Sequence, residues 1–223
     1  MRVVALLVVL FALLRASVAH ADDAADLDAI TKAAPHCEAT RAHCFAIRLH
    51  VARTSAAAMV VDPAWIAAQL AFANKQFEPL DTSFQLAAVD FLPETAARLE
   101  DRAARNALAK RVTGTVIDVF LTGYLADVDK PGSFAYGVTW RTKADHKYII
   151  VSGMGRDRTL AHELGHFFGL PHSTYAVSIM NKTARDDPPP EDRRFADEEI
   201  EAMKPVLARL VRSKIIAEVT PAT

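Results

Sequence analysis

The chain has 223 residues, of which 51% are hydrophobic and 24% are charged. This composition predicts a packed core and excludes a disordered or collagen-like protein, since only 8 residues are glycine. The 26 basic residues nearly balance the 27 acidic residues, which argues against nucleic-acid binding because phosphate-binding proteins are usually clearly basic.

The N-terminus carries an uninterrupted apolar run, residues 3–14. Such a run rises only about 18 Å as a helix, which is short of a hydrocarbon core of about 30 Å. Arg2 precedes the run, and Ala19 and Ala21 form a small-x-small cleavage site. Residues 1–21 are therefore predicted to be a secretory signal peptide rather than an uncleaved anchor. We expect a secreted or periplasmic protein with no membrane segment after signal cleavage.

The chain has two cysteines, Cys37 and Cys44. In an oxidising compartment such a pair favours one disulfide bond that closes a small loop. The alternative is two buried free thiols, because an unpaired cysteine often behaves as a small apolar side chain.

The first half of the exported chain alternates between predicted helices and strands. Residues 22–34 are polar and rich in alanine, which indicates a peripheral helix. Apolar and polar residues alternate over 45–52, as in a half-buried strand. Asp62 precedes Pro63 and is the expected N-cap of a helix that runs to residue 77. Residues 84–92 are predicted to form a second strand.

The middle of the chain is predicted to contain one charged helix and three strands. Residues 93–110 are rich in Ala, Glu, Arg and Leu, and we expect a solvated surface helix there. A strongly apolar strand follows over 115–121. A turn at 130–132 then leads to two further strands, predicted for 133–140 and 147–152.

The last third of the chain is predicted to contain two helices separated by irregular chain. The first helix covers 158–168 and the second covers 195–211, with Pro205 expected to kink the second or to mark its start. Residues 186–190 read Asp-Asp-Pro-Pro-Pro, which excludes regular structure. Mixed helices and strands without an internal repeat predict one α/β or α+β domain.

The residues with the clearest chemical pattern are 162–172, His-Glu-Leu-Gly-His-Phe-Phe-Gly-Leu-Pro-His. His162 and His166 lie four residues apart, so a helix places both on one face, where they can bind one metal ion. Gly169 can take a positive φ and end the helix, which leaves His172 free to complete the ligand set. Neutral imidazole is a good ligand for zinc.

Three protein ligands leave a fourth coordination position for water, as in catalytic rather than structural zinc sites. Glu163 lies beside that position and is predicted to be the general base. The alternative is a chance arrangement of surface histidines, which is disfavoured because five fixed residue types at fixed spacings rarely coincide. The other histidines of the exported chain have no such spacing and are expected on the surface: His36, His43, His50 and His146.

The motif resembles the HExxHxxGxxH signature of the metzincin zinc endopeptidases. Met180, in Ser-Ile-Met-Asn and eight residues after His172, resembles the methionine of the family's Met-turn beneath the zinc site. Ser173 and this spacing are most similar to the matrixins. The resemblance implies an α+β, metzincin-like zincin fold, with a twisted mixed β-sheet, long helices, a zinc helix and a small irregular C-terminal subdomain ending in a helix.

The same resemblance implies a domain organisation. Residues 22–44 would be an N-terminal lead-in or a short pro-segment, and residues 45–223 would form a single metallopeptidase domain. Its upper subdomain would extend to about residue 169 and its lower subdomain would cover 170–223. Because pro-segment cysteines occupy the zinc site in many metzincins, a zinc switch at Cys37 is an alternative to the disulfide.

The implied activity is zinc-dependent cleavage of peptide bonds by an activated water, with one catalytic Zn²⁺ on the three histidines. A protein or peptide substrate would add a strand to an exposed sheet edge near Tyr136, Gly137 and Val138. We expect a monomer. Family analogy allows calcium or a second zinc, but the sequence indicates no site for either. The alternatives are a non-catalytic zinc-bearing peptide-binding module and a zinc hydrolase of a non-protein amide.

Overall fold

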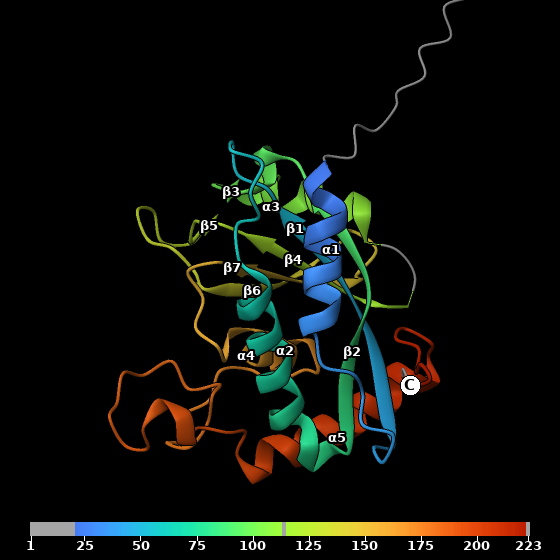
Figure 1. Ribbon diagram of the computed structural model, residues 1–223. Helices are drawn as coiled ribbons and strands as arrows, with labels where there is room; N and C mark the ends of the chain where they lie inside the picture. The colour runs from blue at the N-terminus through green and yellow to red at the C-terminus, as the bar shows by residue number, and fades with distance from the viewer. Residues whose placement is uncertain (1–20, 113–114, 222–223) are drawn as a thin grey trace, which may run out of the picture.

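The computed structural model describes residues 21–112 and 115–221. Its main sheet has five strands in the order β2-β1-β4-β7-β6, parallel except for β6, which is antiparallel to β7 (Figure 1). The strands are β1 (His43–Ala52), β2 (Thr82–Leu92), β4 (Ile117–Thr122), β6 (Gly137–Arg141) and β7 (Lys147–Ser152). A small second sheet pairs β3 (Arg98–Leu99) with β5 (Tyr124–Leu125). The predicted signal peptide lies outside the described residues except for Ala21.

The helices of the described residues confirm the predicted α+β class. They are α1 (Ala21–Ala33), α2 (Pro63–Phe77), α3 (Arg102–Ala107), α4 (Thr159–Phe167) and α5 (Asp197–Arg212). In Figure 1, α1 and α2 run side by side in front of the sheet and α5 crosses the lower part of the molecule. Pro205 lies inside α5 and does not mark its start. None of these helices is both long and apolar enough to span a bilayer.

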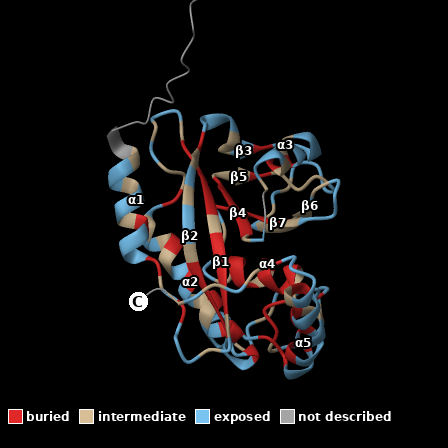
Figure 2. Ribbon diagram, turned by 90° about the vertical axis from the view of Figure 1, so that its right-hand side faces the viewer, coloured by how far each residue is buried: buried red, intermediate tan, exposed pale blue. Residues whose placement is uncertain are grey.

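Apolar side chains cover both faces of the main sheet, because successive residues of a strand point to opposite sides. On one face, Ile149 and Val151 pack with residues of α2, α4 and α5. On the other face, Tyr148 and Ile150 pack in a second cluster with Phe120. β1 is largely buried on both faces (Figure 2), so the prediction of a half-buried strand was wrong. A strand inside a parallel sheet needs cover on both sides.

His50 is buried, contrary to the surface position expected for it, with 1% of its surface exposed. It lies on β1, and its Nε2 is 2.8 Å from Asp118 Oδ1 on the neighbouring strand β4. Its ring stacks on Phe120, with the ring centroids 4.3 Å apart. The carboxylate supplies the polar partner that a buried imidazole needs, and it comes from a strand far away in the sequence.

Residues 93–110 do not form the single charged helix predicted for them. The segment divides into the 3-10 turn η2 (Glu94–Ala96), β3, α3 and the turn η3 (Leu108–Arg111). Asp101 accepts a hydrogen bond from Ala104 N at 2.8 Å and so begins a new helix. Arg105 is buried and donates to the Ala126 carbonyl. The charged residues had indicated a solvated helix, but the segment covers the second apolar cluster with Leu99 and Leu108.

The N-terminal helix α1 is docked on the rest of the domain. Ile30 is fully buried in the main core cluster. Arg53, at the end of β1, forms ion pairs with two carboxylates of α1, Asp23 and Asp26. Residues before β1 are therefore part of the folded unit.

A disulfide bond joins Cys37 to Cys44, which confirms the predicted pairing. Both cysteines are buried, and Cys44 lies at the start of β1. Because each sulfur is bonded to the other, neither thiol is available as a zinc switch.

Candidate active site

The helix α4 and the turn after it position the three histidines of the motif. His162 and His166 lie one turn apart on α4, which confirms the helix predicted for 158–168. Gly169 has a φ of +98° and donates from its backbone nitrogen to the His166 carbonyl at 3.0 Å. A positive φ favours glycine, and a Cβ there would lie 3.2 Å from Val206 Cγ2. The reversal at this glycine brings His172 back to the helix.

The three imidazoles converge as a zinc site requires. One ring nitrogen from each of His162, His166 and His172 lies within 4.8 Å of the others. The Nε2 atoms of His166 and His172 are 3.1 Å apart. Two nitrogens bound tetrahedrally to one zinc ion are separated by roughly 3.3 Å. The donor type and this separation therefore fit zinc.

Backbone carbonyls fix the orientation of two of the rings. His162 Nδ1 lies 2.8 Å from the Ile179 carbonyl oxygen, and His166 Nδ1 lies 2.7 Å from that of Leu170. Because a carbonyl only accepts, each Nδ1 carries the hydrogen and each Nε2 presents a lone pair. Burial lowers the pKa of His162 and of His172 to about 4 and also lowers that of His166. The imidazoles are therefore neutral at pH 7, the form that binds metal.

Met180 lies beneath α4 and is fully buried. A Cβ on Gly165 would lie 2.7 Å from Met180 Sδ, so the helix approaches the methionine closely at this glycine. Met180 N donates to Ser178 Oγ at 2.8 Å, and that hydroxyl lies 2.7 Å from a carboxylate oxygen of Glu199. The segment expected to be the Met-turn is thus a tight turn held from below by α5.

Glu163 points from α4 toward the edge strand β6. Thr139 Oγ1 lies 3.0 Å from Glu163 Oε2 and 2.7 Å from the Glu163 carbonyl oxygen. A Cβ on Gly137 would lie 2.8 Å from Glu163 Cγ. Burial raises the pKa of Glu163 to about 8, because desolvation penalises the carboxylate. A cation bound at the adjacent histidines would lower the pKa of Glu163, because it would stabilise the carboxylate.

The strand β6 is the outer strand of the main sheet beside this carboxylate. Among the described strands it pairs with β7 alone. Of the residues predicted for substrate contact, Gly137 and Val138 begin β6 and Tyr136 directly precedes it, with 41% of its surface exposed. An unpaired strand edge offers backbone donors and acceptors to an extended peptide.

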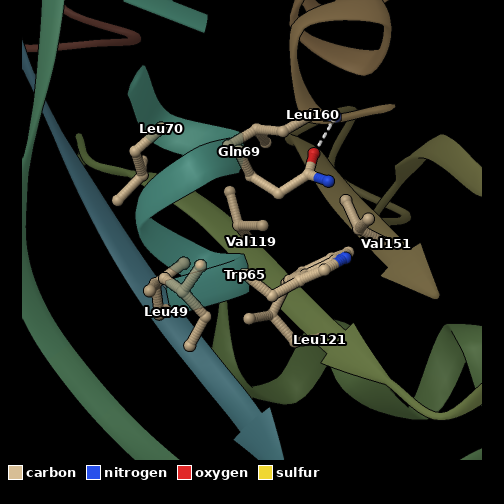
Figure 3. A pocket seen from close by; sticks show the side chains of 9 residues that line it. Leu49, Trp65, Gln69, Leu70, Val119, Leu121, Val151 and Leu160 are labelled. Atoms are coloured by element: carbon tan, nitrogen blue, oxygen red, sulfur yellow. Dashed lines mark hydrogen bonds between the residues drawn. The ribbon is translucent and has the colours of Figure 1, made fainter. Parts of the chain in front are cut away.

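Side chains from other elements hold both ends of α4. Gln69 of α2 accepts from Leu160 N at 2.9 Å (Figure 3). It also donates to the Arg156 carbonyl at 2.8 Å. At the other end, Lys147 Nζ donates to the carbonyls of His166 and Phe167. The cavity beside Gln69 has a volume of about 10 Å³ and an otherwise apolar lining, so it is too small for a substrate.

The matrixin family model matches residues 69–206, which is more than half of the chain and includes all three histidines. The chain belongs to the matrixin family. Membership makes it a zinc metallopeptidase that acts on proteins or peptides and confirms the predicted resemblance. A comparison with curated proteins found no match for the matrixin chain.

The fold of this matrixin is also similar to solved structures. The crystal structure of archaemetzincin (amzA) from Methanopyrus kandleri has 21% sequence identity and a TM-score of 0.50, covering 76% of this chain and 98% of that chain. Metalloproteinase-II from Bacteroides fragilis has 13% identity and a TM-score of 0.49, covering 79% of this chain and 60% of that one. The archaemetzincin likeness supports the predicted metzincin-like zincin fold.

Four residues that support this matrixin site carried no clear motif in the sequence: Gln69, Thr139, Lys147 and Glu199. Each contacts the site from an element distant in sequence. Only Glu199 had a local signal, since it is the third residue of α5 and accepts from Ala196 N at 2.8 Å in the manner of a capping residue.

Proposed function

We propose that the chain is a secreted zinc-dependent endopeptidase of metzincin type. His162, His166 and His172 are the zinc ligands in this proposal, and Glu163 is the general base. The observation that carries it is the convergence of three neutral imidazole nitrogens beside a carboxylate on the same helix.

Zinc, when bound, supplies a Lewis acid that polarises a carbonyl and lowers the pKa of water toward neutrality. The Ile179 and Leu170 carbonyls hold the imidazoles in the tautomer that can bind it. Glu163 accepts a proton from the attacking water and delivers it to the leaving amine. The Thr139 hydroxyl, within hydrogen-bond distance of both the carbonyl and the carboxylate of Glu163, orients the Glu163 side chain.

A substrate peptide lies along β6 as an added strand and passes Glu163 at Gly137. The close approach of Gly137 to the Glu163 side chain supports this path, because any larger residue there would displace the carboxylate. Main-chain hydrogen bonds to the strand edge then supply affinity that is independent of the peptide sequence.

Export is part of the proposal. The apolar run and cleavage site at residues 1–21 support it, as does the Cys37–Cys44 disulfide, since disulfides persist in oxidising compartments. The exported chain acts as a monomer in this proposal. It retains residues 22–44, because α1 is docked on the core through Ile30.

The test is cleavage of a peptide library by purified residues 22–223, read by mass spectrometry, with and without a chelator. Glu163→Ala and Glu163→Gln are expected to retain about one zinc per chain. Both should lower the turnover number by about 10²-fold or more, which is the size of a general-base effect. Undiminished cleavage by either variant would remove Glu163 from its role. A folded, zinc-loaded chain that cuts no peptide would overturn the endopeptidase proposal.

A further inference from the structure

Five basic side chains gather around the start of α4 and the loop after Met180, and we call them the basic cluster: Arg156, Arg158, Lys182, Arg185 and Arg193. Arg158 directly precedes α4, so its Cα lies about 6 Å along the helix from that of His162. Its guanidinium is half-buried and faces like charges from three other arginines of the cluster.

The basic cluster has no acidic partner among the described residues. All ion pairs of the described residues, with nitrogen–oxygen distances up to 4.0 Å, are formed by basic residues outside the cluster. Arg102 and Arg141, by contrast, each pair with an aspartate. The acids adjacent to cluster members in sequence, Asp157, Asp186 and Asp192, are exposed and form no such pair with the cluster.

Two members of the cluster are held by carbonyl oxygens. Arg185 donates to the carbonyls of Ala176 and Ser178, and Arg193 donates to those of Pro188 and Arg185. Carbonyl oxygens satisfy the guanidinium hydrogens but leave the positive charge without a counter-charge. The loop is therefore organised around cations that an anion would neutralise.

The basic cluster borders the proposed peptide path from two sides. The Arg156 guanidinium carbon lies 5.6 Å from the centroid of the Tyr136 ring, which directly precedes β6. On the side of the loop, Lys182 is exposed and lies two residues after Met180, which packs against α4 at Gly165. A peptide that pairs with β6 would therefore run beside Arg156 at the start of the strand.

We propose that the basic cluster binds a carboxylate of the substrate and makes this enzyme selective for acidic peptides. Arg158 and Arg156 are the principal contacts, because their side-chain nitrogens make no hydrogen bond or ion pair with described residues. This inference rests on the proposed peptidase function.

The carboxylate can come from an Asp or Glu side chain or from the C-terminus of the peptide, and the first experiment separates these sources. Matched peptides carry Glu or Gln at each position around the cleaved bond, each with a free or an amidated C-terminus. We expect kcat/KM to be about 10-fold higher for Glu than for Gln at one position, as charge-assisted pairing predicts. A preference for the free C-terminus alone would assign the carboxylate to the chain end.

Variants test whether the basic cluster causes the preference. Arg158→Gln and Arg156→Gln should bring the ratio of the two kcat/KM values toward one, and Arg158→Lys should preserve part of it because the charge remains. The matched control is Arg212→Gln, an exposed arginine at the end of α5, which should leave the ratio unchanged. Circular dichroism identifies any variant that fails to fold.

A binding measurement keeps the inference separate from the proposed function. The Glu163→Ala chain, with and without zinc, is titrated with fluorescent Glu and Gln peptides and followed by anisotropy. Tighter binding of the Glu peptide that is lost in Arg158→Gln supports the inference even if no peptide is cut. Equal affinities, or a difference that survives both arginine substitutions, would overturn it.

Discussion

Replacing Glu199 by alanine should remove the support beneath Met180. The Glu199 carboxylate is 5% exposed and accepts hydrogen bonds from Ser178 Oγ and Ala196 N at 2.7–2.8 Å. Each hydrogen bond to a charged group contributes about 1.5–3 kcal/mol, and its loss leaves a donor without a partner. Glu199→Ala should therefore lower the free energy of unfolding by about 3–5 kcal/mol, a large part of the total for a domain of this size.

The assay is urea denaturation of the zinc-free chain, followed by titration of the refolded chain with zinc. Glu199→Gln keeps an acceptor without the charge and should lose roughly half as much stability. Glu201→Ala is the matched control, because this exposed residue of the same helix pairs only with Lys204 among the described residues and should cost about 0.5 kcal/mol or less. Zinc affinity should fall with Glu199→Ala, since the turn that carries the His162 partner loosens. A cost no larger than that of Glu201→Ala would refute the reasoning.

Three further substitutions test contacts around the site. Thr139→Val should lower kcat about tenfold with little change in the free energy of unfolding, because it removes the hydroxyl that orients Glu163. Thr139→Ser keeps the hydroxyl and should restore kcat, so equal kcat values in the two variants would count against this role. Cys37→Ser opens the disulfide loop and should lower the urea-derived stability by about 2.5 kcal/mol, an effect that reductant should reproduce in the unaltered chain. Gly165→Ala should destabilise the chain in thermal denaturation, because contact with Met180 costs about 1–3 kcal/mol against a gain of about 1 kcal/mol in helix propensity; a higher Tm would contradict the close packing.

Local features were predictable where the determining interactions lie within a few residues. The strand 147–152 has the predicted bounds, because a compact apolar run between polar turns defines it. Asp62 caps α2 as expected, since its side chain needs only the Trp65 nitrogen three residues on. The histidine spacing and Gly169 belong to the same class, because helix periodicity and the permissive φ of glycine are properties of the local chain.

Other features were mispredicted because their environment comes from distant segments. The charged segment 93–110 breaks at Asp101, and its residues Leu99 and Leu108 turn inward onto the second apolar cluster. His50 is buried because Asp118, on another strand, supplies its partner. A charge or a histidine favours the surface only until a partner makes burial affordable, and that partner is not visible in a local pattern.

The sequence by itself determined the chemistry of this protein. The three histidines, Glu163 and the two cysteines are specified by residue type and short spacing, and these predict a zinc site on a helix and a disulfide bond. Only the tertiary structure decided what supports and surrounds that site. Thr139 of β6 lies beside the Glu163 carboxylate, Glu199 of α5 accepts from Ser178 beneath Met180, and the basic cluster lacks acidic partners among the described residues. The physical reason is that a ligand set follows from local geometry, whereas hydrogen-bond partners, burial and counter-charges depend on which distant segments the fold brings together.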